Sequence, residues 1–313
     1  MGRSLLARIP GSLTLAPVTI GRSLLAGIPG SLTLAPVTEL DALFHVDGDT
    51  VVPTALARGP WSPDAQHGGA PSALLAGMLE RFEPGPAEFT ARLTVDLMRP
   101  VPLAPLRIER TMVRPGKKVQ IVQGSLFSGD TEVVRATALR MRTIDPAYDD
   151  MGTNSEVEPL PPPGTPTTFP FAQGRPPGFW NVVELSPAVG TFAAPVNGRT
   201  AVWFRLRVPV IAGEEPSPLQ RVAAVADFGN GMGMAVDRER FSFINPDLTV
   251  ILHREPVGEW VALDGTSHAE GSGVGVAETV LHDERGRIGR GIQTILLEQW
   301  PGGVRPADQG IAG

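Results

Sequence analysis

One plan of secondary structure occurs twice along the chain, and this repetition is the strongest constraint on its fold. Residues 43–142 start with two short strand-like pieces, continue with an apolar helix at 70–81 and end in four long alternating segments. Residues 200–297 follow the same plan, with a strand, a short helix at 219–226 and several further strands. Alternation of apolar and polar side chains is typical of half-buried antiparallel strands. The sequence therefore predicts an α+β protein in which two sheets each wrap one helix.

The first predicted helix has the composition of a buried helix. Pro71 stands in its first turn, where the missing N–H would have no helical partner in any case. Apolar side chains then recur at helical spacing, at Leu74, Leu75, Met78 and Leu79. We expect this helix to pack closely against a sheet.

A proline-rich stretch separates the two halves. Residues 146–185 contain a triple proline at 161–163 and a proline pair at 176–177. Proline lacks the N–H that strand pairing needs, so this stretch cannot lie inside a sheet. The predicted order is an N-terminal half at 41–145, a linker at 146–185, a C-terminal half at 186–300 and a tail at 301–313.

The segment before the first half is an internal duplication. Residues 2–20 recur at 21–39 with only two substitutions. Two copies are too few for a solenoid, and proline and glycine interrupt each copy. We expect residues 1–40 to be a poorly ordered extension. A signal peptide is the alternative, although Arg8 and Pro10 break its apolar stretch.

Composition excludes several classes of protein. The chain has no cysteine, which excludes disulfides, Cys-ligated metals and a Cys nucleophile. Its formal net charge of -6 and its 6% of aromatic residues argue against nucleic-acid binding. No apolar run reaches the roughly 18 residues that a membrane helix needs, and the histidines lack metal-site spacing. We expect a cytoplasmic protein without a metal or cofactor.

Four short motifs occur in an order typical of one enzyme family. They are His67-Gly68-Gly69, Arg99-Pro100, His253-Arg254 and Glu259-Trp260. Over about residues 41–300 the chain resembles the bacterial type II acyl-CoA thioesterases and the broader thioesterase-like family of actinobacterial type. The resemblance implies a double hotdog, in which two antiparallel sheets in one chain each wrap a central helix. It also implies hydrolysis of fatty acyl-CoA to free acid and CoA, and a homodimer of such chains.

The same resemblance implies a catalytic group. The family uses an Asp on the second helix, a Thr at the start of a strand and a Gln on the last strand. These positions fall on Asp227, Asn245 and Gln293. Asn245 departs from the family, because an amide can orient a water molecule but lacks the hydroxyl of Thr.

Thioester hydrolysis calls for these residue types on chemical grounds. A carboxylate near a water molecule can take its proton, and an amide can hold that water in line for attack. Backbone N–H groups at a helix start can stabilise the oxyanion, and glycine lets the substrate carbonyl approach them. We therefore predict substrate binding at His67, Gly68 and Gly69, beside the catalytic Asp227, Asn245 and Gln293.

Other interpretations stay open. The chain can be a hotdog protein that binds acyl-CoA or lipid without turnover, or a thioesterase for chains attached to a carrier protein. Hydration is disfavoured, because hotdog hydratases usually present a histidine about five residues after the Asp, and the next one after Asp227 is His253. On an acidic chain, CoA phosphates need a local basic patch, with Arg99, Arg114, Lys117 and Lys118 as candidates.

Overall fold

The computed structural model describes residues 42–145, 159–169, 174–191, 194–234 and 236–303, together with Tyr148, Gly152 and Ala172. Contacts within the chain divide it between residues 38 and 39, and every described residue belongs to the second unit. The expected extension at 1–40, several residues of the expected linker and all but the first residues of the tail lie outside the described residues.

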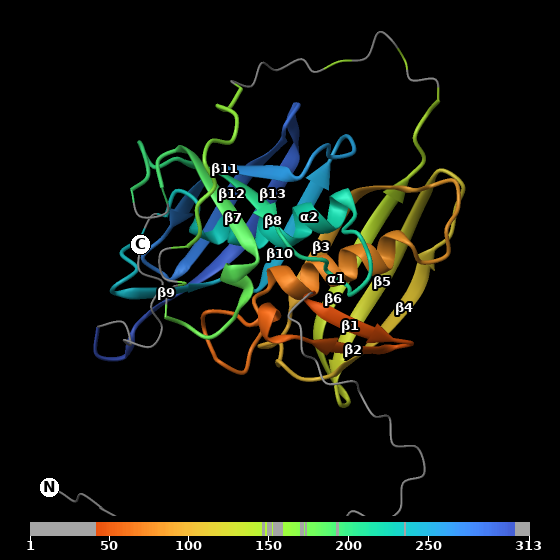
Figure 1. Ribbon diagram of the computed structural model, residues 1–313, viewed down its shortest axis with the longest axis horizontal. Helices are drawn as coiled ribbons and strands as arrows, with labels where there is room; N and C mark the ends of the chain where they lie inside the picture. Colours follow the sequence, from red (N-terminus) through yellow and green to blue (C-terminus); the bar gives the residue numbers. More distant parts are fainter. Residues whose placement is uncertain are drawn as a thin grey trace, which may run out of the picture. The chain divides into compact units, whose positions relative to one another are not determined.

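The described residues form one antiparallel sheet of thirteen strands with two α-helices (Figure 1). The first half contains β1 Phe44–Asp47, β2 Thr50–Pro53, α1 Gly69–Glu80, β3 Phe89–Leu97, β4 Leu106–Arg114, β5 Val119–Ser128 and β6 Thr131–Met141. The second half contains β7 Val183–Val189, β8 Thr200–Leu206, α2 Pro218–Ala226, β9 Phe241–Ile244, β10 Asp247–Leu252, β11 Trp260–Ala269, β12 Val274–Asp283 and β13 Gly286–Gln299. Short 3-10 turns are η1 Ala55–Ala57, η3 Phe179–Asn181, η4 Asp227–Gly231 and η5 Pro301–Gly303.

The two halves have the same strand order, as the repeated plan in the sequence predicts. They meet where β3 pairs with β10, along residues 92–96 and 247–251. Outward from this junction the first half runs β3, β6, β5, β4, β2, β1, and the second runs β10, β13, β12, β11, β8, β7. Strand β9 pairs with β13 outside this path. Each half therefore places its first strand, β1 or β7, at an edge, and the junction is formed by β3 and β10.

Both helices lie close to the boundaries that the sequence predicts, and both are buried. Every residue of α1 is buried except Glu80. Helix α2 begins with Pro218 at its first position and with a capping box, in which Ser217 and Gln220 each bond the backbone N–H of the other. Capping by side chains satisfies the backbone donors that a helix start leaves free.

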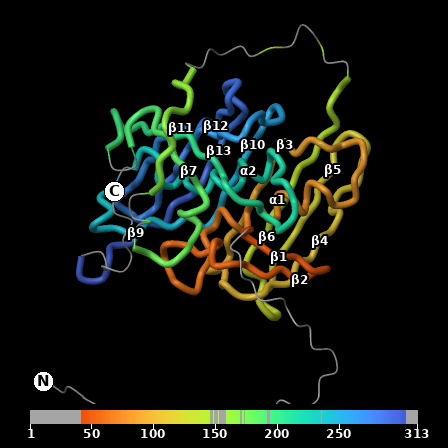
Figure 2. The backbone as a smooth tube through the Cα atoms, in the orientation of Figure 1, coloured from red at the N-terminus to blue at the C-terminus, as the bar shows by residue number. Residues whose placement is uncertain are grey.

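The two helices pack against each other (Figure 2). A Cβ on Gly69 would collide with the carbonyl oxygen of Ala224, and a Cβ on Gly77 would collide with the side chain of Gln220. The start of α1 thus lies beside the end of α2. Glycine is needed at position 69 because a backbone carbonyl approaches it so closely, whereas at position 77 it leaves room for the side chain of Gln220.

The sequence did not predict β7, which begins inside the expected linker. Pro187 lies in this strand and is exposed. Strand β7 is an edge strand of the sheet, with a bridge from Leu185 to Thr167 but no further strand beyond it among the described residues, and an edge strand tolerates proline where no partner needs its N–H. Phe179 and Trp180, in the same stretch of chain, are buried in the core, so part of the expected linker is packed structure.

Candidate active site

The carboxylate of Asp227 lies where α2 ends and η4 begins. The apolar side chains of α2 bury this helix against the sheet and α1, and Asp227 is only 5% exposed. A buried carboxylate needs hydrogen-bond donors in order to stay ionised. Its partners therefore define the site.

Asn245, directly after β9, donates from Nδ2 to Oδ1 of Asp227 over 2.8 Å. The same amide nitrogen donates to the carbonyl oxygen of Asp247 at 3.2 Å. Asn230, in η4, donates from Nδ2 to Oδ1 of Asn245 at 2.7 Å. Both N–H bonds of the Asn245 amide are thus used, and Asn230 fixes the orientation of that amide.

Gln293 approaches the same carboxylate from β13. Its Nε2 lies 3.3 Å from the backbone oxygen of Asp227 and 3.4 Å from Oδ1, and the side chain is 1% exposed. On its other side, a Cβ on Gly229 would come within 2.6 Å of Oε1 of Gln293. The fold thus brings together all three residues that were predicted to be catalytic.

His67 reaches Asp227 from the first half of the chain. Its Nδ1 lies 3.1 Å from Oδ2 of Asp227. The imidazole stacks on the ring of Phe179, with centroids 4.5 Å apart, and lies 4.7 Å from the ring of Phe228. Burial lowers the pKa of His67, and the neighbouring Asp227 carboxylate opposes this shift. The lowered pKa favours a neutral imidazole at neutral pH.

The Nδ1 atom of His67 has two neighbours, of which one is a hydrogen-bond donor and the other an acceptor. The backbone N–H of Gly69 points at Nδ1 from 3.0 Å, while Oδ2 of Asp227 lies 3.1 Å from the same atom. In a neutral imidazole, Nδ1 either lacks a proton and accepts from Gly69, or carries a proton and donates to the carboxylate. An ionised Asp227 favours a proton on Nδ1, and this tautomer leaves the N–H of Gly69 able to serve another acceptor.

Gly68 touches the carboxylate from the side of α1. A Cβ at this position would lie 2.8 Å from Oδ2 and 3.0 Å from Oδ1 of Asp227, and 2.9 Å from Cδ1 of Leu97. Of the Gly68-Gly69 pair that the sequence indicated, Gly68 is therefore needed beside the carboxylate itself, while Gly69 is needed beside the carbonyl oxygen of Ala224.

Sequence reasoning placed His67 in substrate binding and missed its contact with Asp227. It also missed Asn230 and Phe179. No periodic signal links residues so far apart in sequence. The run Phe228-Gly229-Asn230-Gly231 after an apolar helix was the one local sign of an unusual helix end.

Two structural findings bear on other classes of site. Within the described residues, no group of three or more His, Asp or Glu side chains is arranged to hold a metal ion. None of the helices in the described part of the chain is both long and apolar enough to cross a membrane.

Solved structures with related folds come from several bacteria. A candidate thioesterase II from Thermobifida fusca superposes with a TM-score of 0.61 at 18% identity, over 81% of this chain and 94% of that one. A hotdog protein of unknown function from Alicyclobacillus acidocaldarius gives 0.60 at 18%, over 83% and 97%. Acyl-CoA thioesterase II TesB2 from Mycobacterium marinum gives 0.54 at 15%, over 84% and 96%. At such identities the likeness shows the fold, which is a hotdog fold.

Sequence comparisons identify the family. Curated proteins gave no significant match. The family model of the acyl-CoA thioesterase N-terminal domain matches residues 57–141, and that of the acyl-CoA thioesterase C-terminal domain matches residues 155–297. The two models follow one another in order and together cover most of the chain, which therefore belongs to the acyl-CoA thioesterase family.

Proposed function

We propose that this protein hydrolyses fatty acyl-CoA to a free acid and CoA, and that its two halves are two hotdog units in one chain. One observation carries the proposal. The buried carboxylate of Asp227 is held by the amides of Asn245 and Gln293 and lies 3.1 Å from the imidazole of His67. Membership of the acyl-CoA thioesterase family supports the choice of an acyl-CoA substrate.

In this mechanism Asp227 is the general base. Its Oδ1 accepts from the two amides, whereas Oδ2 has His67 alone as a polar partner among the described residues and keeps a lone pair that can take a proton from water. The water oxygen bonds to the thioester carbon, and the resulting oxyanion then expels the CoA sulfur. The proton held by Asp227 passes to that sulfur, and the products are acid and free thiol. A positioned general base typically contributes about 100-fold to 10,000-fold in rate.

Asn245 has a more specific role here than the resemblance implied. Because both of its N–H bonds are used by Asp227 and Asp247, it positions the carboxylate and does not hold water through its nitrogen. This role needs a donor, which both Asn and the family's Thr possess. The departure from Thr is therefore compatible with turnover.

The start of α1 supplies the oxyanion donor. When His67 donates from Nδ1 to Asp227, the N–H of Gly69 is free to bond the oxyanion, assisted by the positive end of the helix. Loss of one such donor typically costs about 100-fold or more in rate. Through His67, the ionisation of Asp227 therefore determines whether the N–H of Gly69 is available to the oxyanion.

The contact between His67 and Asp227 also favours a second candidate function. An imidazole beside a carboxylate can act as an acid and base pair for adding water across a double bond next to the thioester. The sequence argued against this reaction because no histidine follows Asp227 closely, but His67 reaches the carboxylate from the other half. A hydratase would consume enoyl-CoA without releasing a thiol.

Thiol release from acetyl-, hexanoyl-, decanoyl- and palmitoyl-CoA tests the proposal, with enoyl absorbance followed in parallel on crotonyl-CoA. We expect thiol release that depends on chain length and falls about 1,000-fold in Asp227→Asn. Loss of enoyl absorbance without thiol would support the hydratase. Binding of acyl-CoA without either reaction would support a binding protein, and preference for acyl-carrier protein would move the substrate to carrier-bound chains. Pairing into a homodimer and a cytoplasmic location stay predictions.

A further inference from the structure

A pocket of about 320 Å³ lies between the loop before α1 and the segment before β7. Arg58 and Trp61 line it from the loop, and Arg175 and Trp180 line it from the segment. Glycine, serine and proline residues complete its walls. We refer to it as the Arg–Trp pocket.

The Arg–Trp pocket is physically joined to the candidate active site. Trp180 directly follows Phe179, whose ring stacks on His67. The backbone N–H of Phe179 donates to the carbonyl oxygen of Arg58 at 2.9 Å. The N–H of His67 donates to the carbonyl oxygen of Ala57 at 2.9 Å. One wall of the pocket is therefore continuous with the residues that hold the imidazole.

The charge of this pocket differs from that of the protein as a whole. Among the described residues that line it there are two guanidinium groups and no carboxylate, although the chain carries a formal charge of -6. Two other cavities, of about 430 and 450 Å³, are each lined by two acidic side chains and one arginine: Asp49, Glu109 and Arg110 in one, Asp283, Glu284 and Arg285 in the other. Among these three cavities, the Arg–Trp pocket is the one suited to an anion.

The side chains that line the pocket are held in place. Arg58 donates from Nη1 to the carbonyl oxygen of Pro177 at 2.6 Å and from Nε to that of Pro63 at 3.0 Å. The guanidinium of Arg175 lies over the ring of Trp180, 5.7 Å from its centroid. Trp61 packs edge to face on Phe243 at 5.3 Å. Fixed side chains lose little freedom on binding, which favours affinity.

We infer that the Arg–Trp pocket binds the phosphorylated adenosine end of CoA, an inference that rests on the proposed function for its choice of ligand. Guanidinium groups bind phosphate through paired N–H donors. Flat indole and guanidinium surfaces stack on purine bases. The adjoining active site receives the acyl thioester, so the two ends of one substrate occupy neighbouring sites. The basic residues near β4 and β5 that the sequence suggested for phosphate are then not the main site.

Binding of adenosine 3′,5′-bisphosphate, measured by calorimetry, tests the pocket without any turnover. We expect Arg175→Gln to weaken this binding about tenfold, since a charge-assisted bond is lost, and Arg175→Lys to restore part of it. Arg142→Gln removes an exposed positive charge elsewhere and is the control, with affinity unchanged. Thermal melting of each variant verifies that it is folded.

Kinetics with two substrates extend the test. Arg175→Gln should raise KM for acyl-CoA about tenfold and leave kcat unchanged, while both constants for the acyl-pantetheine thioester, which lacks the nucleotide, stay the same. Equal losses with both substrates, or bisphosphate binding that Arg175→Gln does not weaken, would overturn the inference. Weakened bisphosphate binding in a protein that hydrolyses no thioester would uphold the pocket and refute the proposed function.

Discussion

The ends of the two helices occupy equivalent places in the two halves but have different chemistry. Each helix ends in a carboxylate that faces the start of the other helix. At the end of α1, Glu80 accepts a hydrogen bond from Oγ of Ser217, the N-cap of α2, at 2.6 Å. At the end of α2, Asp227 lies 3.1 Å from His67. The Glu80 carboxylate therefore has a hydroxyl as its neighbour, and the Asp227 carboxylate has an imidazole.

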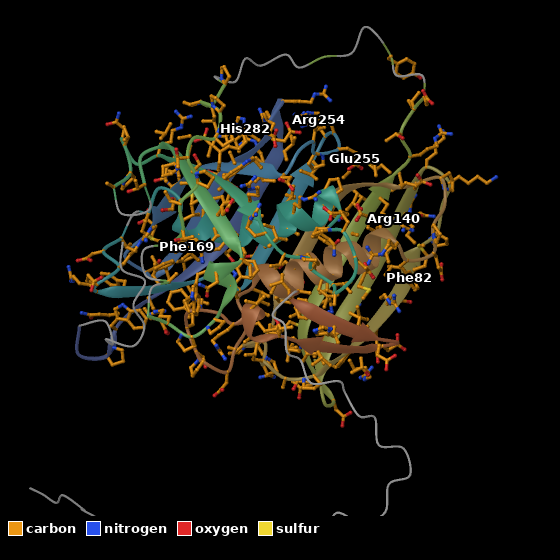
Figure 3. All side chains as sticks on the ribbon, in the orientation of Figure 1. Phe82, Arg140, Phe169, Arg254, Glu255 and His282 are labelled. Carbon is orange, nitrogen blue, oxygen red and sulfur yellow. The ribbon has the colours of Figure 1, made fainter. Side chains whose placement is uncertain are left out.

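The last strand of each half adds a second difference. In the first half, Arg140 of β6 is 1% exposed and donates to the carbonyl oxygens of Leu79, Glu80 and Phe82, and also to Gln120 (Figure 3). In the second half, β13 supplies Gln293, which makes only long contacts of 3.3 and 3.4 Å to Asp227. A charged group closes the end of α1, whereas a neutral amide leaves the end of α2 less tightly bonded.

This contrast indicates that the two helix ends have different roles, one structural and one chemical. Removing a buried charged partner leaves several acceptors unsatisfied and is costly, so the Arg140 end serves stability. A carboxylate next to an imidazole and two amides is an arrangement for proton transfer. We therefore assign the structural role to the first end and the chemical role to the second.

The largest expected effect is a difference in the free energy of unfolding between variants of Arg140, on β6, and Gln293, on β13. Arg140→Met should lower the free energy of unfolding by about 3–5 kcal/mol, because the carbonyl groups at the end of α1 lose their donor. Gln293→Met should lower it by about 1 kcal/mol but reduce kcat about 100-fold. Urea unfolding and thiol release on each folded variant check this. Equal stability losses with unchanged kcat in Gln293→Met would remove the contrast.

Asn245→Asp sharpens the comparison on the catalytic side. A second carboxylate would replace a donor 2.8 Å from Oδ1 of Asp227, and a neighbouring like charge raises a carboxyl pKa. We expect kcat to fall about tenfold at the acidic end of the pH profile and to fall less at its alkaline end, because the added like charge disfavours the ionised base. The matched change Asn197→Asp, in an exposed turn, should leave the profile unmoved.

The smallest expected effect concerns the pH dependence of stability. Burial lowers the pKa of His67 in the folded protein, so between that lowered pKa and about 6.5 the unfolded chain binds more protons. Stability from this group is complete above that window and is lost as pH falls through it. Burial also lowers the pKa values of His253 and His282, which likewise makes stability rise with pH. Burial raises the pKa values of Glu80 and Glu255, which makes stability fall as pH rises.

His67→Gln should therefore flatten, but not abolish, the rise in unfolding free energy with pH. The change in slope is at most about 1.4 kcal/mol per pH unit, which corresponds to one proton. Urea melts between pH 5 and 7.5 measure it, and the exposed His268 supplies His268→Gln as a control with the slope of the wild type. An unaltered slope in His67→Gln would show that His67 titrates alike in the folded and unfolded chains.

Local patterns in the sequence predicted most of the fold. Helix α1 was expected at 70–81 and lies at Gly69–Glu80, because its apolar spacing and Pro71 are local signals. Strand β7 was not expected, because its first residues fall in the proline-rich stretch that was predicted as a linker, and Pro187 is tolerated in it because β7 is an edge strand. Edge positions follow from the topology of the whole sheet, which local alternation does not report.

The site could be predicted only in part. Asp227 and Gln293 were assigned through resemblance, and the fold places them in contact. The contact of His67 with Asp227 depends on how α1 packs against α2, and the closure of α1 by Arg140 depends on the position of β6. Such contacts join residues far apart in sequence, so residue types alone do not reveal them.

The most direct test of these two roles compares Glu80, at the end of α1, with Asp227, at the end of α2, in one assay. Thiol release from the preferred acyl-CoA is measured for wild type, Asp227→Asn and Glu80→Gln, each at the same folded concentration. We predict that kcat falls about 1,000-fold in Asp227→Asn and stays within about twofold of wild type in Glu80→Gln. A comparable loss of kcat in both variants, or a loss confined to Glu80→Gln, would contradict the assignment of catalysis to the end of α2.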